Sequence, residues 1–347
     1  MATRMLAAFA IVVSIVVSGF SQTRTMQIAG VQRSYIVHAP SGLQNPPFVL
    51  NIHGYNMDAA SEQSYTRMDQ IADREKFIVV YPNAINKSWN MSGQDDFTFL
   101  MAIIDTIDNQ YHIDRKRIYS CGFSQGGFMT FQLACRYSDV FAAIAPTSGN
   151  LTGNCSLKRP MSMRLTFGTD EGFEGGSAGF MANVTKWIAM IGCPEIPEVT
   201  RPYPPSNPNS VVTRLYYGPC DDGTVVIADS IRTGQHEWPM NTNDRINNSE
   251  ETWAFLKQFS LPDETPVRKS VPSMMSVPVS ATYNAGVIHL RGVEEVCPVR
   301  VIDTEGRLVV SASAQWNRIS FTNKSSGVYF VQIERENGSV ARRVLIP

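Results

Sequence analysis

From residue 33 to residue 259 the sequence alternates short apolar runs with segments of helical periodicity, and this alternation restricts the fold more than any other feature. The run PFVLNIHG, at 47–54, is apolar and continuous enough for a strand buried on both faces. The segment 95–111 has apolar residues near helical spacing and acids in its first turn, as a helix dipole favours. Strands that alternate with helices predict a mostly parallel sheet covered on both faces.

The segment SCGFSQGGF, at 120–128, places Ser124 between Gly122 and Gly126. A strand reading RIYSCGFS leads into this segment, and a helix reading GGFMTFQLACRYS follows the serine. A strained turn between strand and helix is the context in which a nucleophile elbow presents a serine Oγ above the sheet. The context predicts that Ser124 is a nucleophile. The alternative is an idle serine in a glycine-rich turn.

A serine hydroxyl needs a base to take its proton, and we expect that base to be a histidine. In hydrolases with a nucleophile elbow the chain order is serine, acid, histidine. Only His236 and His289 follow Ser124, and His289 belongs to the C-terminal region. The sequence therefore predicts His236 as the base. The other three histidines lie in an early strand, at a strand end and at a helix end: His38, His53 and His112.

The acid that orients the base is expected in LTFGTDEGFEGG, where Asp170 and Glu171 follow a strand side by side. This pattern does not choose between the two carboxylates, and both stay open. Other acids between the serine and the histidine lie at helix ends or in polar turns, which is typical of solvated charges: Asp139, Glu195, Asp221 and Asp222.

Two backbone N–H groups are expected to bind the oxyanion that forms during ester cleavage. The residue after the nucleophile, Gln125, is predicted to supply one of them from a helix N-terminus. The second is expected from the loop after NIHGY, at Tyr55 or its neighbours. No cysteine or histidine cluster has metal-ligand spacing, and this chemistry needs no metal or organic cofactor.

The N-terminus has the layout of a secretory signal peptide, predicted over residues 1–21. Arg4 precedes a mostly apolar run from Leu6 to Val17, which is shorter than the roughly 20 residues that cross a bilayer. Small residues then offer a cleavage site near Gly19 or Ser21. The alternative is a short membrane anchor. The sequence thus predicts a secreted or cell-surface protein.

Export makes the six cysteines candidates for disulfides. We expect the pairs Cys135–Cys155 and Cys193–Cys220, and free buried thiols at Cys121 and Cys297. The formal net charge is −1 and the chain has no long basic stripe, so nucleic acid is not an expected partner.

From residue 262 the composition changes. Residues 262–280 contain four prolines and no clear period, which indicates an extended linker. Residues 281–347 contain short alternating runs, with hairpin signals at Asn337-Gly338 and at Glu305-Gly306. The sequence predicts a small all-β module here, of the sandwich type.

With these residues assembled, the chain between 33 and 259 resembles the secreted poly(3-hydroxybutyrate) depolymerases, feruloyl esterases and acetylxylan esterases (carbohydrate esterase family one). The resemblance implies an α/β-hydrolase fold for the domain at 22–261, with Ser124 as nucleophile and His236 as base. The motifs that carry it are NIHGY, DREKFIVVYPNAINKSWN, YSCGFSQGGFM, SDVFAAIAPTSG, EGGSAGF, GCPE and GQHEWP.

One motif departs from the family pattern, in which His-Gly-Thr-X-Asp precedes the EGG element by a few more residues. Here the segment at 167–171 reads Phe-Gly-Thr-Asp-Glu and is shortened afterwards. Glu171 matches the family acid by position and Asp170 matches it by residue type. Trp89 and Trp238 match family positions that form pocket walls, and plain core packing is the alternative for both.

The resemblance implies a serine esterase that acts on feruloyl or acetyl groups of plant cell-wall polysaccharide such as xylan. Within the same chemistry the alternative is depolymerisation of poly(3-hydroxybutyrate). A non-catalytic binding protein on a hydrolase scaffold is a further alternative, although such a protein would normally lack part of the triad. The C-terminal module resembles the sorting domains of the bacterial type IX secretion route, through SSGVYFVQIERENGSVARRVLIP, which implies secretion machinery as a partner. A small polymer-binding module is the alternative for that region.

Overall fold

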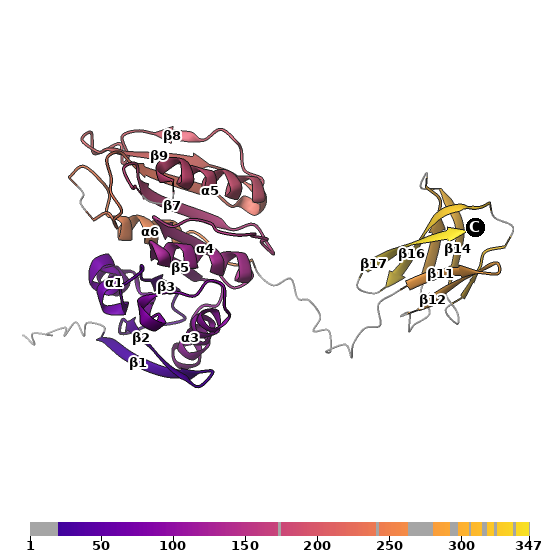
Figure 1. Cartoon of the computed structure of the whole chain (residues 1–347), viewed down its shortest axis with the longest axis horizontal. Coiled ribbons are helices and arrows are strands. Elements are labelled where there is room, and N and C mark those ends of the chain that lie inside the picture. Colours follow the sequence, from indigo (N-terminus) through magenta and orange to yellow (C-terminus); the bar gives the residue numbers. More distant parts are fainter. Residues whose placement is uncertain are drawn as a thin grey trace, which may run out of the picture. The chain divides into compact units, whose positions relative to one another are not determined.

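The computed structural model describes residues 20–172, 175–240, 243–262, 280–291, 298–304, 307–313, 318–322, 325–335 and 338–346. The chain divides into two compact units, 1–263 and 264–347 (Figure 1). The predicted signal peptide lies outside the described residues except for its last two positions, which begin the first strand. The predicted linker is likewise described only at its two ends.

The first unit is built on one ten-stranded sheet in the order β1-β2-β4-β3-β5-β6-β7-β10-β9-β8. The six strands from β4 to β10 in this order run parallel, while β1, β2, β9 and β8 add antiparallel edges. This confirms the predicted mostly parallel sheet. The strands are β1 (Phe20–Ile28), β2 (Val31–Ala39), β3 (Phe48–Ile52), β4 (Ile78–Pro82), β5 (Ile118–Phe123), β6 (Ala143–Thr147), β7 (Ser162–Gly168), β8 (Glu198–Thr200), β9 (Val212–Tyr217) and β10 (Val226–Ile231).

Helices cover both faces of this sheet (Figure 1). One face packs against α3, α4 and α5, and the other packs against α1, α2 and α6. The helices are α1 (Ala59–Thr66), α2 (Met68–Glu75), α3 (Asp95–Tyr111), α4 (Gln125–Tyr137), α5 (Gly176–Met190) and α6 (Asn248–Leu256), with short 3₁₀ turns η1 (Ile85–Lys87) and η2 (Asp221–Gly223).

The central strands are buried along their whole length because both of their faces are covered. Successive side chains of β3 illustrate this: Phe48 and Leu50 enter the core under α3 and α4, while Val49 enters the core under α2 and α6. The continuous apolar runs of the sequence are therefore strands whose side chains pack alternately into two hydrophobic cores.

Two disulfides join segments of the first unit, Cys135–Cys155 and Cys193–Cys220, and both confirm the predicted pairing. The first ties the end of α4 to the loop that follows β6. Cys121 is a free, buried thiol, as predicted, and burial raises its pKa well above the usual value. Cys297 lies outside the described residues.

The second unit is all-β and antiparallel, as predicted, with its two sheets sharing one core. The predicted hairpins correspond to the pairs β16–β17 and β13–β14. Of the four predicted turn residues, Glu305, Gly306 and Asn337 lie outside the described ranges, and Gly338 is the first residue of β17, paired with Arg335. One sheet has the order β11-β12-β15 and the other β14-β13-β16-β17. The strands are β11 (Ser280–Asn284), β12 (Val287–Arg291), β13 (Pro298–Ile302), β14 (Leu308–Ser313), β15 (Arg318–Ser320), β16 (Gly327–Arg335) and β17 (Gly338–Ile346).

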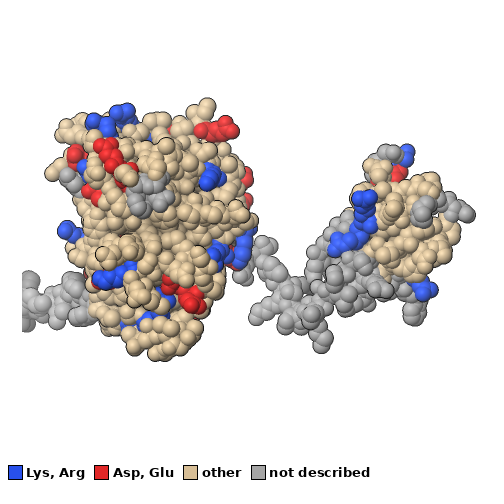
Figure 2. All heavy atoms as spheres, viewed as in Figure 1, with Lys and Arg blue, Asp and Glu red and all other residues tan. Residues whose placement is uncertain are grey.

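The charges on the first unit are mixed. On the face drawn in Figure 2, lysine and arginine side chains alternate with aspartate and glutamate over its surface. Within the described part of the chain, no helix combines the length and apolar character that a membrane crossing requires.

Candidate active site

The candidate site residues lie at the carboxyl ends of five neighbouring parallel strands. Because these carboxyl ends lie on the same side of the sheet, the residues that follow β3, β5, β6, β7 and β10 gather there. These residues are, in that order, Gly54 with Tyr55, Ser124, Ser148, Glu171 and His236.

Ser124 occupies the turn between β5 and α4 in a strained backbone conformation. Its φ of 54° and ψ of −119° lie outside the regions that residues with side chains favour, at a cost of about 1–3 kcal/mol. The Ser124 N–H donates to the Thr147 carbonyl over 2.9 Å, and the Ser124 carbonyl accepts from the Phe128 N–H over 3.1 Å. The turn is fixed from both sides, in the geometry of a nucleophile elbow.

The glycines that flank the serine are required by close backbone contacts. A Cβ at Gly126 would lie 1.8 Å from the carbonyl oxygen of Ile52, at the end of the neighbouring strand β3. A Cβ at Gly122 would lie 2.6 Å from the same oxygen. Only glycine at both positions lets the first turn of α4 pack this closely on β3.

His236 lies on the loop after β10, with its ring between the serine and a carboxylate. Its Nε2 is 2.9 Å from Ser124 Oγ, and its Nδ1 is 2.7 Å from Glu171 Oε2. Since an ionised carboxylate only accepts, Nδ1 carries the proton and donates, which leaves the Nε2 lone pair facing the serine hydroxyl. The Phe123 ring packs on the imidazole at a centroid distance of 4.8 Å.

Of the two candidate acids, the structure brings Glu171 to the histidine and leaves Asp170 at the surface. Glu171 is buried, and its second oxygen, Oε1, accepts from the Ser148 hydroxyl and from the Gly168 N–H, each over 2.7 Å. Asp170 is exposed, and its carboxylate accepts from the neighbouring Thr169 hydroxyl.

The turn that carries the two acids is joined to the loop that carries the histidine. The Asp170 N–H donates to the Gly234 carbonyl over 3.0 Å, and the Thr233 N–H donates to the Thr169 hydroxyl over 2.8 Å. A Cβ at Gly168 would lie 2.2 Å from the Gly234 carbonyl oxygen. These backbone contacts fix which acidic side chain points inward.

The two predicted oxyanion donors flank the serine. Gln125 is the first residue of α4, where a backbone N–H has no carbonyl acceptor within the helix. On the other side, a Cβ at Gly54 would lie 3.2 Å from Ser124 Cβ, so the backbone before Tyr55 passes close to the nucleophile. The positions agree with the predicted roles, which remain predictions.

His53 supports this loop. Its Nε2 accepts from the Ala84 N–H over 3.1 Å, so its Nδ1 carries the proton and donates to the Gly54 carbonyl over 2.7 Å. Burial lowers the pKa of His53, which favours this neutral state.

Trp89 and Trp238, predicted as walls of the substrate pocket, are 4% and 2% exposed. The Trp89 indole N–H donates to the His53 carbonyl, and the Trp238 indole N–H donates to Ser249 Oγ, each over 2.9 Å. This burial favours the alternative of core packing for both. Their rings support the loops around the site and offer a substrate almost no surface.

Two residues at the site were not singled out in the sequence. Ser148 follows β6 in PTSGN and lies within the family motif SDVFAAIAPTSG, so the motif and its position at a strand end are the signals that could have drawn attention to it. Tyr65 accepts a hydrogen bond from the Trp238 N–H over 2.8 Å and packs on Phe123, and it lies on α1, a helix that the sequence analysis did not name.

Two loops near the site carry exposed apolar side chains. Tyr55 is 68% exposed, and Ile85, in the turn η1, is 44% exposed. The Asn56 N–H donates to the Lys87 carbonyl over 2.9 Å, which joins the two loops that carry these side chains.

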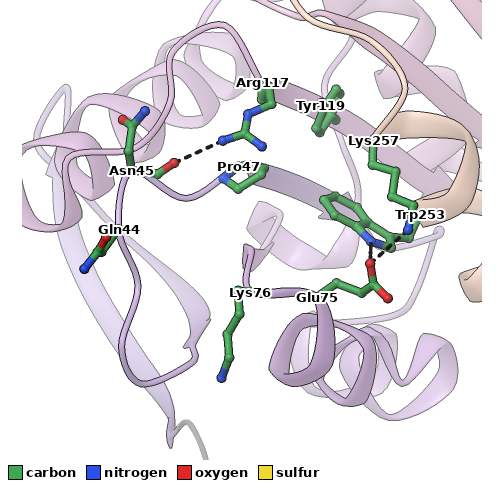
Figure 3. A pocket seen from close by; sticks show the side chains of 9 residues that line it. All are labelled: Gln44, Asn45, Pro47, Glu75, Lys76, Arg117, Tyr119, Trp253 and Lys257. Atoms are coloured by element: carbon green, nitrogen blue, oxygen red, sulfur yellow. Dashed lines mark hydrogen bonds and ion pairs between the residues drawn. The ribbon is translucent and has the colours of Figure 1, made fainter.

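A separate pocket of about 390 Å³ lies at the amino ends of the parallel strands, where β3 and β5 begin (Figure 3). Its charged groups contact partners within the chain: Glu75 accepts from Lys257 over 2.9 Å, and Arg117 pairs with Asp114 over 2.6 Å. Among the nine described residues that line it, none is a serine, cysteine or histidine, so it offers no nucleophile–base pair. In the described part of the chain, no group of three or more histidine, cysteine or acidic residues has the arrangement of a metal site.

Comparison with known proteins agrees with this geometry. Residues 33–164 match the family described as esterase PHB depolymerase, and residues 279–347 match the secretion system C-terminal sorting domain. The resemblances predicted from the sequence are confirmed for both parts of the chain.

Similar proteins include the bifunctional acetylxylan esterase/xylanase XynS20E of Neocallimastix patriciarum, which is 31% identical over 74% of this chain and 36% of its own length. Feruloyl esterase B of Piromyces equi is 28% identical over 66% of this chain and 46% of its own length. Poly(3-hydroxyalkanoate) depolymerase C of Paucimonas lemoignei is 34% identical over 32% of this chain and 30% of its own length. The chain thus spans less than half the length of each of these curated relatives.

Among solved structures, an acetyl xylan esterase from Aspergillus awamori superposes with a TM-score of 0.54 at 14% identity. The match covers 68% of this chain and 99% of that chain. At this identity the likeness concerns the fold alone, and it confirms the α/β-hydrolase fold of the first unit.

Proposed function

Because residues 33–164 of the chain match the family described as esterase PHB depolymerase, we propose that the first unit is a serine carboxylic-ester hydrolase. One observation carries this proposal: Ser124 Oγ lies 2.9 Å from His236 Nε2, and His236 Nδ1 lies 2.7 Å from Glu171 Oε2. In the proposal Ser124 is the nucleophile, His236 is the general base and Glu171 is the acid that orients it.

The reaction follows from these contacts. His236 Nε2 takes the hydroxyl proton as Ser124 Oγ attacks the ester carbonyl, and the N–H groups of Gln125 and Tyr55 stabilise the oxyanion. The imidazolium then returns the proton to the departing alcohol, which leaves an acyl group on Ser124. Water, deprotonated by His236, attacks the acyl carbonyl. The imidazolium then returns this proton to Ser124 Oγ as the acyl bond breaks, which releases the carboxylic acid and restores the free serine. Glu171 stays ionised throughout and stabilises the imidazolium.

For the substrate we favour feruloyl or acetyl esters on a cell-wall polysaccharide such as xylan. Two relatives named for these activities align with about two thirds or more of the chain, which supports this choice. The exposed Tyr55 and Ile85 side chains, on loops joined to each other, offer apolar surface on which a sugar or aryl ring could pack. Cleavage of a polyester is the alternative, favoured by the name of the matching family.

The second unit supports a location outside the cytoplasm. Residues 279–347 match a secretion system C-terminal sorting domain, and we propose that secretion machinery is the partner of this unit. The esterase would then act on extracellular polymer, as a secreted or cell-surface protein.

The test is a comparison of kcat/KM on methyl ferulate, an acetylated xylo-oligosaccharide and a hydroxybutyrate oligomer, with Ser124→Ala as the blank. We expect turnover that depends on Ser124 and a higher kcat/KM on methyl ferulate or on the acetylated xylo-oligosaccharide. A higher kcat/KM on the hydroxybutyrate oligomer would mean that the enzyme degrades polyesters. Equal turnover by wild type and Ser124→Ala would refute the hydrolase assignment itself.

A further inference from the structure

Ser148 is buried beside the acid of the proposed triad, and we infer that it is a positioning residue that holds Glu171 against His236. This inference rests on the proposed function. The Ser148 hydroxyl donates to Glu171 Oε1 over 2.7 Å, and we infer that it acts on the reaction through this carboxylate.

The backbone of Ser148 aims its side chain at Glu171. The residue follows β6, is fully buried and has a φ of 51°, in the left-handed region where glycine is favoured. Its N–H donates to the Thr166 carbonyl over 2.9 Å, and the next residue, Gly149, packs its backbone directly against Gly127 of α4. A serine in a conformation that suits glycine indicates that its hydroxyl is retained for a contact.

That contact completes the coordination of the carboxylate. Glu171 Oε1 accepts from Ser148 Oγ and from the Gly168 N–H, each over 2.7 Å, and this leaves Oε2 for His236. A glutamate has one more rotatable bond than the aspartate of the related motif, so its carboxylate needs additional anchoring to keep one orientation. Two donors on Oε1 fix the carboxylate plane, and only the Ser148 donor belongs to a side chain.

Loss of the hydroxyl should therefore lower turnover without altering substrate contacts. For Ser148→Ala we expect kcat on the preferred ester to fall by about 10- to 100-fold, the effect of a misplaced catalytic group, with KM within about twofold. Ser148→Gly should show the same loss of kcat with a higher midpoint of urea unfolding than Ser148→Ala, because both variants lack the hydroxyl but only glycine relieves the positive φ.

Ser120 provides the matched control. It is a fully buried serine on the adjacent strand β5, and its hydroxyl bonds to Thr130 Oγ1 over 3.1 Å, away from the triad. Ser120→Ala should lose stability as a buried hydroxyl does, but its kcat should stay within about twofold of wild type.

A double-mutant cycle separates positioning from a general structural role. If Ser148 acts through the carboxylate, then Ser148→Ala made in Glu171→Gln should lower kcat by less than about threefold further. Equal losses of kcat in both backgrounds, or an unchanged kcat in Ser148→Ala, would overturn the inference. Failure of the proposed function looks different, because then wild type and Ser124→Ala would already have equal turnover.

Discussion

At the scale of single residues, the carboxylate that faces His236 belongs to Glu171, and its neighbour Asp170 faces solvent. Glu171→Gln keeps the shape of the side chain but replaces the acceptor that holds the imidazole tautomer. We expect kcat to fall by about 10³- to 10⁴-fold, as when the orienting acid of a serine triad is neutralised. Asp170→Asn should change kcat by less than about threefold. Steady-state kinetics of both variants measure the two values of kcat. A larger loss of kcat in Asp170→Asn than in Glu171→Gln would mean that Asp170 is the acid of the triad.

A second buried acid, Glu62 on α1, makes stability depend on pH. Both of its carboxyl oxygens are buried without a hydrogen-bond partner in the described part of the chain, and burial raises its pKa well above the usual value. Since the folded state holds this proton more tightly, the stabilisation is complete below the unfolded-state pKa of about 4.3 and is lost as pH rises through the folded-state pKa.

Glu62→Gln removes this titration while keeping the neutral shape. The free energy of unfolding of the variant, relative to wild type, should therefore increase from pH 5 to pH 9, by at most about 1.4 kcal/mol per pH unit. Urea unfolding of both proteins at several pH values measures the difference. A difference that stays constant with pH would mean that Glu62 is already ionised in the folded protein.

At the scale of secondary structure elements, the site depends on how closely the start of α4 approaches the end of β3. Gly126→Ala would place a Cβ 1.8 Å from the Ile52 carbonyl oxygen, so β3 or the elbow must shift. We expect a loss of at least about 3 kcal/mol in unfolding free energy, together with loss of activity. Gly172→Ala is the control, because among the described residues beyond its chain neighbours no atom lies within 4 Å of a Cβ built at Gly172, and its stability should change by no more than about 0.5 kcal/mol. Equal stability of the two variants in urea would show that the start of α4 lies farther from the Ile52 carbonyl than the structure places it.

At the scale of the whole molecule, the triad and both of its supporting cores lie in the first unit, whereas the second unit has a core of its own. A chain that ends at residue 263 should therefore keep kcat/KM on a small soluble ester within about twofold of the full chain. The full-length protein, assayed in parallel, is the control. A tenfold loss with folding retained would mean that the second unit takes part in catalysis.

Local signals explain how much of this molecule could be predicted from its sequence. The helix at 95–111 was predicted over the residues that it occupies, because its acids and its apolar stripe are local features. Ser124 and His236 were found in the same way, through the elbow glycines and the chain order of the triad. By contrast, α1 reads AASEQSYT and has almost no apolar stripe, so the periodicity that predicts a helix is missing and its one local signal is the capping box between Asp58 and Ser61.

The remaining features depend on contacts between distant segments. The choice between Asp170 and Glu171 is made where the turn after β7 bonds to Gly234 on the histidine loop, which neither segment reveals alone. Ser148 lies in the motif SDVFAAIAPTSG, but its contact with Glu171 appears only when the fold brings these two distant residues together. Trp89 and Trp238 could equally have lined a pocket or filled a core, and only their packing in the folded chain distinguishes the two.

Covalent labelling tests whether Ser124 is an activated nucleophile. The full chain is treated with an aryl phosphonate ester reactive toward activated serines, and the site of modification is found by peptide mass mapping. We expect one adduct, on Ser124, no adduct in Ser124→Ala, and ester turnover that falls in proportion to labelling. An adduct on another residue, or full turnover after Ser124 has been labelled, would show that Ser124 is not the nucleophile.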